Sequence, residues 1–364
     1  MRERVAAAVD RLTASRLFPL TGVGPVVLFL FAVQLLGTAT ESAQPVLEAV
    51  LVRVLVADAA ALGLSWLGAY VLANGSVVAA LALSLFTVDV LSPAQLFLMV
   101  AGSRLGAAAI VVFIGALDYV QKERYSLRKS VSMGTLAFLL TLSIYLPATV
   151  VGYLTLPVLR GPFRTVGQHW TVGLRPLSLF EPLTVTITTT IGPGPAVLVA
   201  VGLLFGSLKL FDRLLAGVDT STLRRRFFSH FRRTWVSFAI GLVITGVTTS
   251  VAFSLGVIVP LYNREYIERD ELIPYVLGAN LGTLFDTLLV AAVLESSVGF
   301  AVVLVLLATA TALTLGALAV HDTYARIVGA IDDRVLEDRR AFVAVVLAFV
   351  FLPVALLVVP QVLR

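Results

Sequence analysis

Residues 59–88 read AAALGLSWLGAYVLANGSVVAALALSLFTV, a stretch of 30 residues without a charged side chain. As one continuous helix it would extend ~45 Å, whereas the hydrocarbon core of a bilayer is ~30 Å thick. The polar triplet Asn74, Gly75 and Ser76 lies near its middle. The stretch therefore predicts either a long tilted helix or two half-helices that enter the membrane and turn back.

The whole chain has the composition of a membrane protein. Of its 364 residues, 59% are hydrophobic and only 13% are charged, whereas soluble domains carry ~25% charged residues. Long apolar runs such as 341–359 do not alternate as β-barrel strands do. These features exclude a soluble enzyme and predict an all-α polytopic protein of the cell membrane. Because cysteine and all recognisable catalytic or zinc motifs are absent from the sequence, we expect no catalysis, no cofactor and no metal centre.

Three short matches recur in the same order along the chain. They are GVGPVVL (22–28) with GPGPAVL (192–198), the polar break 74–76 with the polar break 248–250, and GSRLG (102–106) with GANLG (278–282). Their offsets are 170, 174 and 176 residues, so they drift by only a few positions. We interpret them as a duplication of about 100 residues.

Charge distribution predicts how the duplicated units lie in the membrane. Basic clusters lie in residues 2–16, 122–129 and 224–233, and such clusters favour the cytoplasmic side. All three fall on that side, with a cytoplasmic N-terminus, if both polar breaks are tips of re-entrant hairpins. The two repeats then have opposite orientations. Inverted repeats with discontinuous helices are typical of secondary transporters.

The predicted organisation has five parts. They are a cytoplasmic amphipathic N-terminus, a first repeat with its hairpin at about 64–88, a linker with one span and an external loop, a second repeat with its hairpin at about 234–262, and two C-terminal spans. Each repeat consists of a span, a re-entrant hairpin and a broken span. The boundaries of the five parts are 1–21, 22–120, 121–191, 192–296 and 297–364.

The hairpin tips are the candidate binding site. A half-helix that begins at a tip directs its first amides and its positive dipole end at the membrane midplane, which favours an anion. Unwound carbonyls and the hydroxyls of serine and threonine favour sodium. The candidate substrate-binding residues are Asn74, Gly75, Ser76, Arg104, Thr248, Thr249, Ser250 and Asn280. The candidate cation-binding residues on the same reasoning are Ser76, Ser250, Asn280 and Asp286.

Two features leave alternatives open. The glycine pairs 102/106 and 278/282 favour either close helix packing or a local unwinding beside each tip. Arg104 is an intramembrane arginine, which would either bind an anion or pair with a buried acid. Asp286, one helical turn after Gly282, would either ligate a cation or pair with Arg104.

Residues 241–260 and 275–289 resemble the second repeat of the type II sodium/phosphate cotransporters. GANLGT at 278–283 matches the GANIGTT motif of that family, and VTTS at 247–250 stands where its QSSS motif belongs.

The first repeat resembles the same two motifs more weakly. ANGS at 73–76 stands at the QSSS position and keeps only the last serine. GSRLGA at 102–107 stands at the second motif, with Arg104 in place of its asparagine.

This resemblance implies sodium-coupled uptake of inorganic phosphate by alternating access, with sodium as the coupling ion and Thr283 among its ligands. The chain would be a divergent prokaryotic member of the family. Two alternatives stay open: the same fold moving another small anion or working without coupling, and a non-transporting membrane scaffold or sensor. Homo-oligomer formation is left open, and a nucleic-acid partner is not expected because the basic residues suit anionic lipid.

Overall fold

The computed structural model describes residues 2–121, 127–174, 180–216, 233–249, 251, 254 and 268–362, and the described chain is helical almost throughout. Six helices are long and apolar enough to cross a membrane. The predicted all-α polytopic class is therefore confirmed. The six helical stretches are Val23–Val54, Gly134–Thr171, Pro193–Leu215, Arg269–Val293, Ser297–Ala319 and Arg340–Val362.

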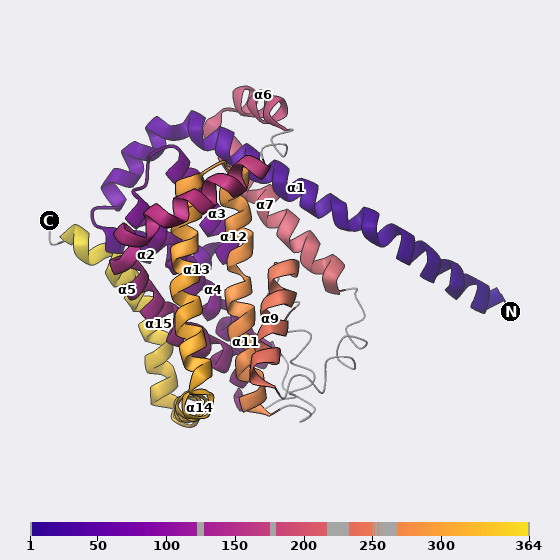
Figure 1. Ribbon diagram of the computed structural model, residues 1–364, viewed down its shortest axis with the longest axis vertical. Helices are drawn as coiled ribbons and strands as arrows, with labels where there is room; N and C mark the ends of the chain where they lie inside the picture. Colours follow the sequence, from indigo (N-terminus) through magenta and orange to yellow (C-terminus); the bar gives the residue numbers. More distant parts are fainter. Residues whose placement is uncertain are drawn as a thin grey trace.

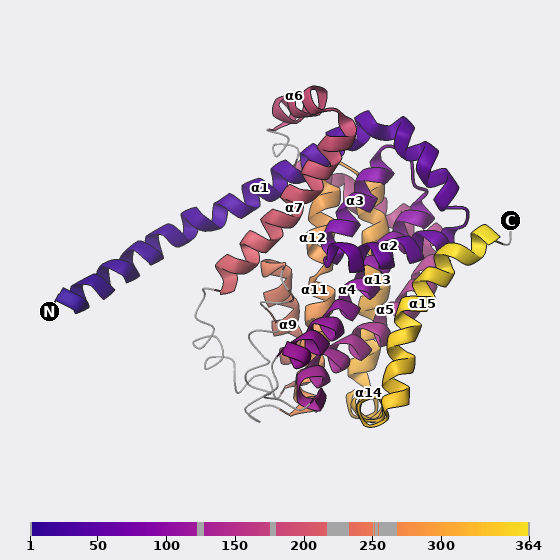
Figure 2. The ribbon, with the colours of Figure 1, turned by 180° about the vertical axis from the view of Figure 1, so that it is seen from behind.

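The helices form a bundle from which the N-terminal part of the first helix projects (Figure 1). They are α1 (Arg2–Val54), α2 (Asp58–Leu72), α3 (Gly75–Thr87), α4 (Pro93–Gln121), α5 (Leu127–Leu174), α6 (Glu181–Ile191), α7 (Pro193–Ala216), α9 (Thr234–Thr248), α11 (Arg269–Gly282), α12 (Leu284–Val293), α13 (Ser297–Ala319), α14 (His321–Glu337) and α15 (Arg339–Val362). Seen from either side, α6 lies at one end of the bundle and α14 at the other (Figures 1 and 2).

The stretch 59–88 is broken, not continuous. Helix α2 ends at Ala73, which adopts the left-handed conformation with φ 48°, and α3 begins directly after Asn74. The two helices have 15 and 13 residues, or ~22 and ~20 Å, so neither is long enough to cross the hydrocarbon core alone. Gly68 of α2 faces Val78 of α3, as the two arms of a hairpin would.

A second break occurs at the end of α9. Thr249 adopts the left-handed conformation with φ 51°, almost the same as Ala73. The return arm expected up to residue 262 lies largely outside the described residues, as does Ser250.

The two breaks belong to equivalent helix pairs. Displacing α2 by 176 residues reproduces the bounds of α9, since Asp58 becomes Thr234 and Leu72 becomes Thr248. The same displacement carries the start of α4, Pro93, to the start of α11, Arg269. The offset of 174 inferred between the polar breaks was wrong by two residues, because the left-handed turn falls at Ala73 and Thr249.

The glycine pairs bring the helices of each pair into backbone contact. A Cβ atom on Gly102 would lie 2.5 Å from the Leu62 carbonyl oxygen, and one on Gly106 would lie 2.6 Å from that of Trp66. In the second pair, Gly278 and Gly282 face α9 in the same way. Close packing is therefore the correct interpretation of both glycine pairs.

The predicted broken span occurs in only one repeat. Helix α4 continues without interruption through Gly102 and Gly106, so the unwinding expected there was wrong. Glycine does not break this helix because its missing side chain is replaced by the backbone of α2. In the second repeat, Thr283 separates α11 from α12.

The linker contains more helix than expected. Residues 160–174 were predicted to be loop, but α5 continues through Pro157 and Pro162 to Leu174. Packing holds this extension in place, since a Cβ on Gly167 would touch the backbone of Ser297, and Trp170 stacks on Phe300 with ring centroids 6.4 Å apart.

Candidate functional site

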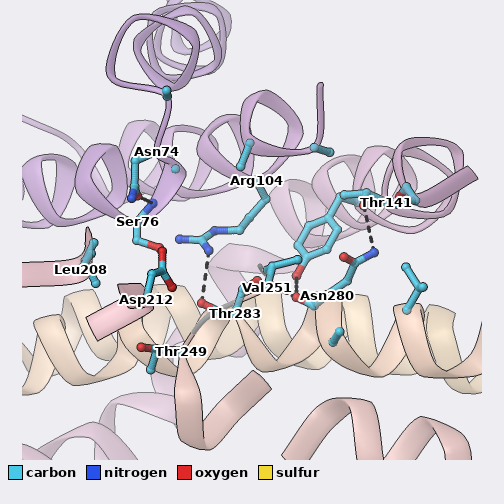
Figure 3. Close-up of a pocket in the computed structure, with 18 of the residues that line it drawn as sticks. Asn74, Ser76, Arg104, Thr141, Leu208, Asp212, Thr249, Val251, Asn280 and Thr283 are labelled. Atoms are coloured by element: carbon cyan, nitrogen blue, oxygen red, sulfur yellow. Dashed lines mark hydrogen bonds between the residues drawn. The ribbon is translucent and has the colours of Figure 1, made fainter. Parts of the chain in front are cut away.

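A cavity of about 360 Å³ lies between the two helix breaks (Figure 3). It receives residues from the ends of α2 and α9, the beginning of α3, and from α4, α5, α7 and α11. The lining residues are Ala73, Asn74, Gly75, Ser76, Arg104, Ala107, Ala108, Ala137, Thr141, Tyr145, Leu208, Phe211, Asp212, Thr249, Val251, Val276, Ala279, Asn280 and Thr283. The structure thus brings together seven of the ten candidate site residues named from the sequence.

The first tip is held by a helix cap. The Asn74 side-chain oxygen accepts hydrogen bonds from the backbone amides of Ser76 (2.9 Å) and Val77 (3.1 Å). Asparagine is among the best residues for this position because it satisfies amides that have no partner within the helix. Gly75 is required next to it, since a Cβ there would collide with the Ser103 carbonyl of α4.

This cap changes what the tip can offer an anion. The first amides of α3 were expected to point freely at a ligand, but those of Ser76 and Val77 are already bonded to Asn74. The tip therefore presents chiefly its dipole, the Ser76 hydroxyl and the side-chain amide of Asn74.

The second tip contributes Thr249, which lines the cavity. Its neighbour Thr248 donates its hydroxyl to the Ile244 carbonyl of its own helix (2.6 Å) and is not among the lining residues. Ser250, the third candidate here, lies outside the described residues.

Arg104 reaches from the first repeat into the second. Its Nη1 donates to the Thr283 carbonyl (3.2 Å), and its Nη2 donates to the Thr287 hydroxyl (3.0 Å). The side chain is only 5% exposed, and its Nε has no hydrogen-bond partner among the described residues. Figure 3 shows the guanidinium between α4 and the break at Thr283.

Asp286 is the acid that faces this arginine. Its Oδ1 lies 3.8 Å from Arg104 Nη2 and accepts a hydrogen bond from the Thr287 hydroxyl (2.8 Å). Asp286 does not line the cavity, and its other oxygen, Oδ2, is buried without a partner in the described structure. Of the two roles left open for Asp286, the structure therefore contains the ion pair.

Asn280 is oriented by a residue outside the repeats. Its side-chain Nδ2 donates to the Thr141 hydroxyl (2.9 Å), which itself donates to the Ala137 carbonyl (2.8 Å). Because the Thr141 hydroxyl proton is used there, the group facing it must be the amide nitrogen, and Asn280 Oδ1 is left for the cavity. The Thr283 hydroxyl donates to the Asn280 carbonyl (2.7 Å).

Three lining residues were not predicted. Tyr145 of α5 donates its hydroxyl to the Asn280 carbonyl (2.8 Å), next to the helix break. Thr141 and Tyr145 are polar residues four apart in an apolar span, which places them on one helix face and is the signal that would have found them. Asp212 of α7 reaches the cavity beside Ser76 (Figure 3).

Comparison with known proteins identifies part of the chain. Residues 203–331 match the family model described as Na+/Pi-cotransporter, which confirms the resemblance for a segment from α7 to α14. This segment contributes Asp212, Thr249, Asn280 and Thr283 to the cavity. No curated protein and no solved structure matches the chain.

Proposed function

From the Na+/Pi-cotransporter domain at residues 203–331, we propose that this multi-pass membrane protein couples entry of sodium to uptake of inorganic phosphate. The observation that carries the proposal is the cavity that receives both helix breaks. Transport proceeds by alternating access, with the two repeats moving around this cavity.

The arrangement of the two hairpins supports this mechanism. Helix α3 lies in the half of the bundle nearer α6, whereas α9 lies in the half nearer α14 (Figures 1 and 2). Two equivalent helix pairs that approach one cavity from opposite halves are expected of inverted repeats. In this orientation the N-terminus and the α14 end face the cytoplasm, in agreement with the basic clusters.

Polar groups of both repeats are available to the anion. Arg104 offers its Nε, Ser76 its hydroxyl and Asn74 its amide nitrogen, all at the wall of the cavity. These are donor groups, as phosphate oxygens require. Thr249 adds a hydroxyl from the opposite tip.

Charge at the site gives sodium coupling a physical reason. The guanidinium of Arg104 is already paired with Asp286, so the pair brings no net positive charge to the cavity. Asp212 adds a carboxylate to the wall, and Arg104 is the sole basic residue among the described lining residues. An anion that enters this membrane-embedded site needs compensating cations, because an uncompensated buried charge is strongly unfavourable. Oxygens of Ser76, Asn280 and Thr283 are the proposed sodium ligands.

Uptake by the purified protein in liposomes tests the proposal. We expect radiolabelled phosphate to accumulate under an inward sodium gradient and not under a potassium gradient. Ser76→Ala should weaken uptake, whereas Ser84→Ala on the same helix should retain it per folded molecule, since Ser84 bonds to Leu36 and Thr40 away from the cavity.

Competition by other oxyanions then separates the alternatives. Sodium-dependent uptake that ignores phosphate but is saturated by a different oxyanion would assign the fold another substrate. Absence of uptake for every oxyanion tried, with Ser76→Ala and wild type behaving alike, would favour a scaffold or sensor.

A further inference from the structure

Three oxygen atoms of the second repeat converge on the guanidinium of Arg104. They are the Thr283 carbonyl and Thr287 hydroxyl oxygens, 3.2 and 3.0 Å from its nitrogens, and the Asp286 carboxylate oxygen at 3.8 Å. The group is deeply buried: Arg104 is 5% exposed, Asp286 2% and Thr287 1%.

These oxygens are of the kind that binds a sodium ion. Thr283 separates α11 from α12, and carbonyls at such interruptions commonly coordinate sodium in transporters. A hydroxyl and a carboxylate complete a hard oxygen set, and the partnerless Asp286 Oδ2 adds a fourth donor. Thr287 gives its proton to Asp286, so its lone pairs face the positive group.

The repeat relation indicates where the positive group came from. A displacement of 176 residues places Arg104 on Asn280, the position that holds a neutral amide in the second repeat. The same displacement places Asp286 on Ile110 and Thr287 on Val111, which are apolar. One repeat thus supplies only the cation and the other only the oxygens.

We infer that Arg104 is a built-in cation that occupies, across the repeat boundary, an oxygen site which would otherwise take a coupling sodium ion. The inference rests on the proposed function and adds to it that this site takes no ion during transport. A tethered guanidinium neutralises Asp286 as a bound ion would, but it cannot be released into the cytoplasm. The carrier therefore needs one sodium ion fewer per cycle than its oxygens could hold.

Replacing Arg104 by the residue of the equivalent position tests this. Purified Arg104→Asn should gain a stabilisation by sodium that wild type lacks. At a sodium concentration tenfold above the dissociation constant, the melting temperature should rise by about 3 °C more than in wild type, with no such gain in potassium.

Two control variants isolate the charge. Arg104→Lys keeps a positive group and should respond to sodium as wild type does. The double variant Arg104→Asn with Asp286→Asn removes both charges, so it should fold without sodium and show no sodium-specific gain.

Several results would overturn the inference. One is an Arg104→Asn variant whose melting temperature in sodium and potassium differs no more than that of wild type. Another is failure of this variant to fold in either salt while the neutral double variant folds, because sodium would then not replace the guanidinium.

Uptake measurements keep the two proposals apart. If wild type transports phosphate, the Hill coefficient for sodium in Arg104→Asn should rise by about one. If wild type transports nothing, the proposed function fails, while the melting-temperature comparison still decides whether Arg104 occupies a sodium site.

Discussion

Substituting Gly106 by alanine should disrupt the contact between α2 and α4 that positions the first hairpin. The new Cβ would lie 2.6 Å from both the Trp66 carbonyl oxygen and the Ala69 Cβ, whereas ordinary contact begins at 3.4 Å. The helices would have to separate by about 0.8 Å, and overpacking of this kind destabilises by about 1–3 kcal/mol.

The size of the effect follows from the identity of the obstructing atoms. Neither the Trp66 carbonyl nor the Cβ of Ala69 can rotate away, so relief requires a movement of the whole helix. Because Arg104 lies on the same helix two residues earlier, we also expect phosphate uptake to fall.

Gly202→Ala on α7 is the matched control. A Cβ at Gly202 meets no described atom within 4 Å, so alanine should be neutral or stabilise the helix by up to about 1 kcal/mol. Thermal unfolding in detergent, followed by size-exclusion chromatography, measures both variants. If Gly106→Ala melted at the same temperature as Gly202→Ala, the argument for glycine-mediated backbone contact would be refuted.

Three further substitutions address the cavity. Asn74→Ala should destabilise the protein by about 1 kcal/mol through loss of the helix cap, whereas Asn74→Asp should keep the cap and stability but weaken phosphate uptake by repulsion; melting curves and uptake assays that show no difference between the two would contradict this. Thr249→Ala should raise the KM for phosphate or sodium, whereas Thr248→Ala should leave both unchanged, since only Thr249 lines the cavity; equal effects would remove Thr249 from the site. Tyr145→Phe should cost about 1 kcal/mol of stability and reduce uptake, because the Asn280 carbonyl loses a hydrogen bond, and an unchanged melting temperature would argue against that bond.

Local sequence was sufficient to locate both breaks to within two residues. A polar triplet inside an uncharged stretch predicts an interruption, and the left-handed residue fell at Ala73 and at Thr249. The register between the two breaks was misjudged, because matching polar letters aligned Asn74 with Thr248. The conformation pairs Asn74 with Ser250 instead.

The glycine pairs show where sequence alone was ambiguous. The pattern at Gly102 and Gly106 favours packing and unwinding equally, since both need a missing side chain. The backbone of α2 against these glycines decides for packing, and no property of residues 102–106 contains that information.

Hydropathy, repeat and turn chemistry are properties of neighbouring residues, so the sequence by itself determined the membrane class, the duplication and the positions of the hairpin tips. The hydrogen bonds of Arg104 join residues 179 and 183 positions apart, and Tyr145 reaches Asn280 across 135 positions. Only the tertiary structure decided these contacts, because they depend on how four helices pack around one cavity and not on the conformational preferences of any single segment.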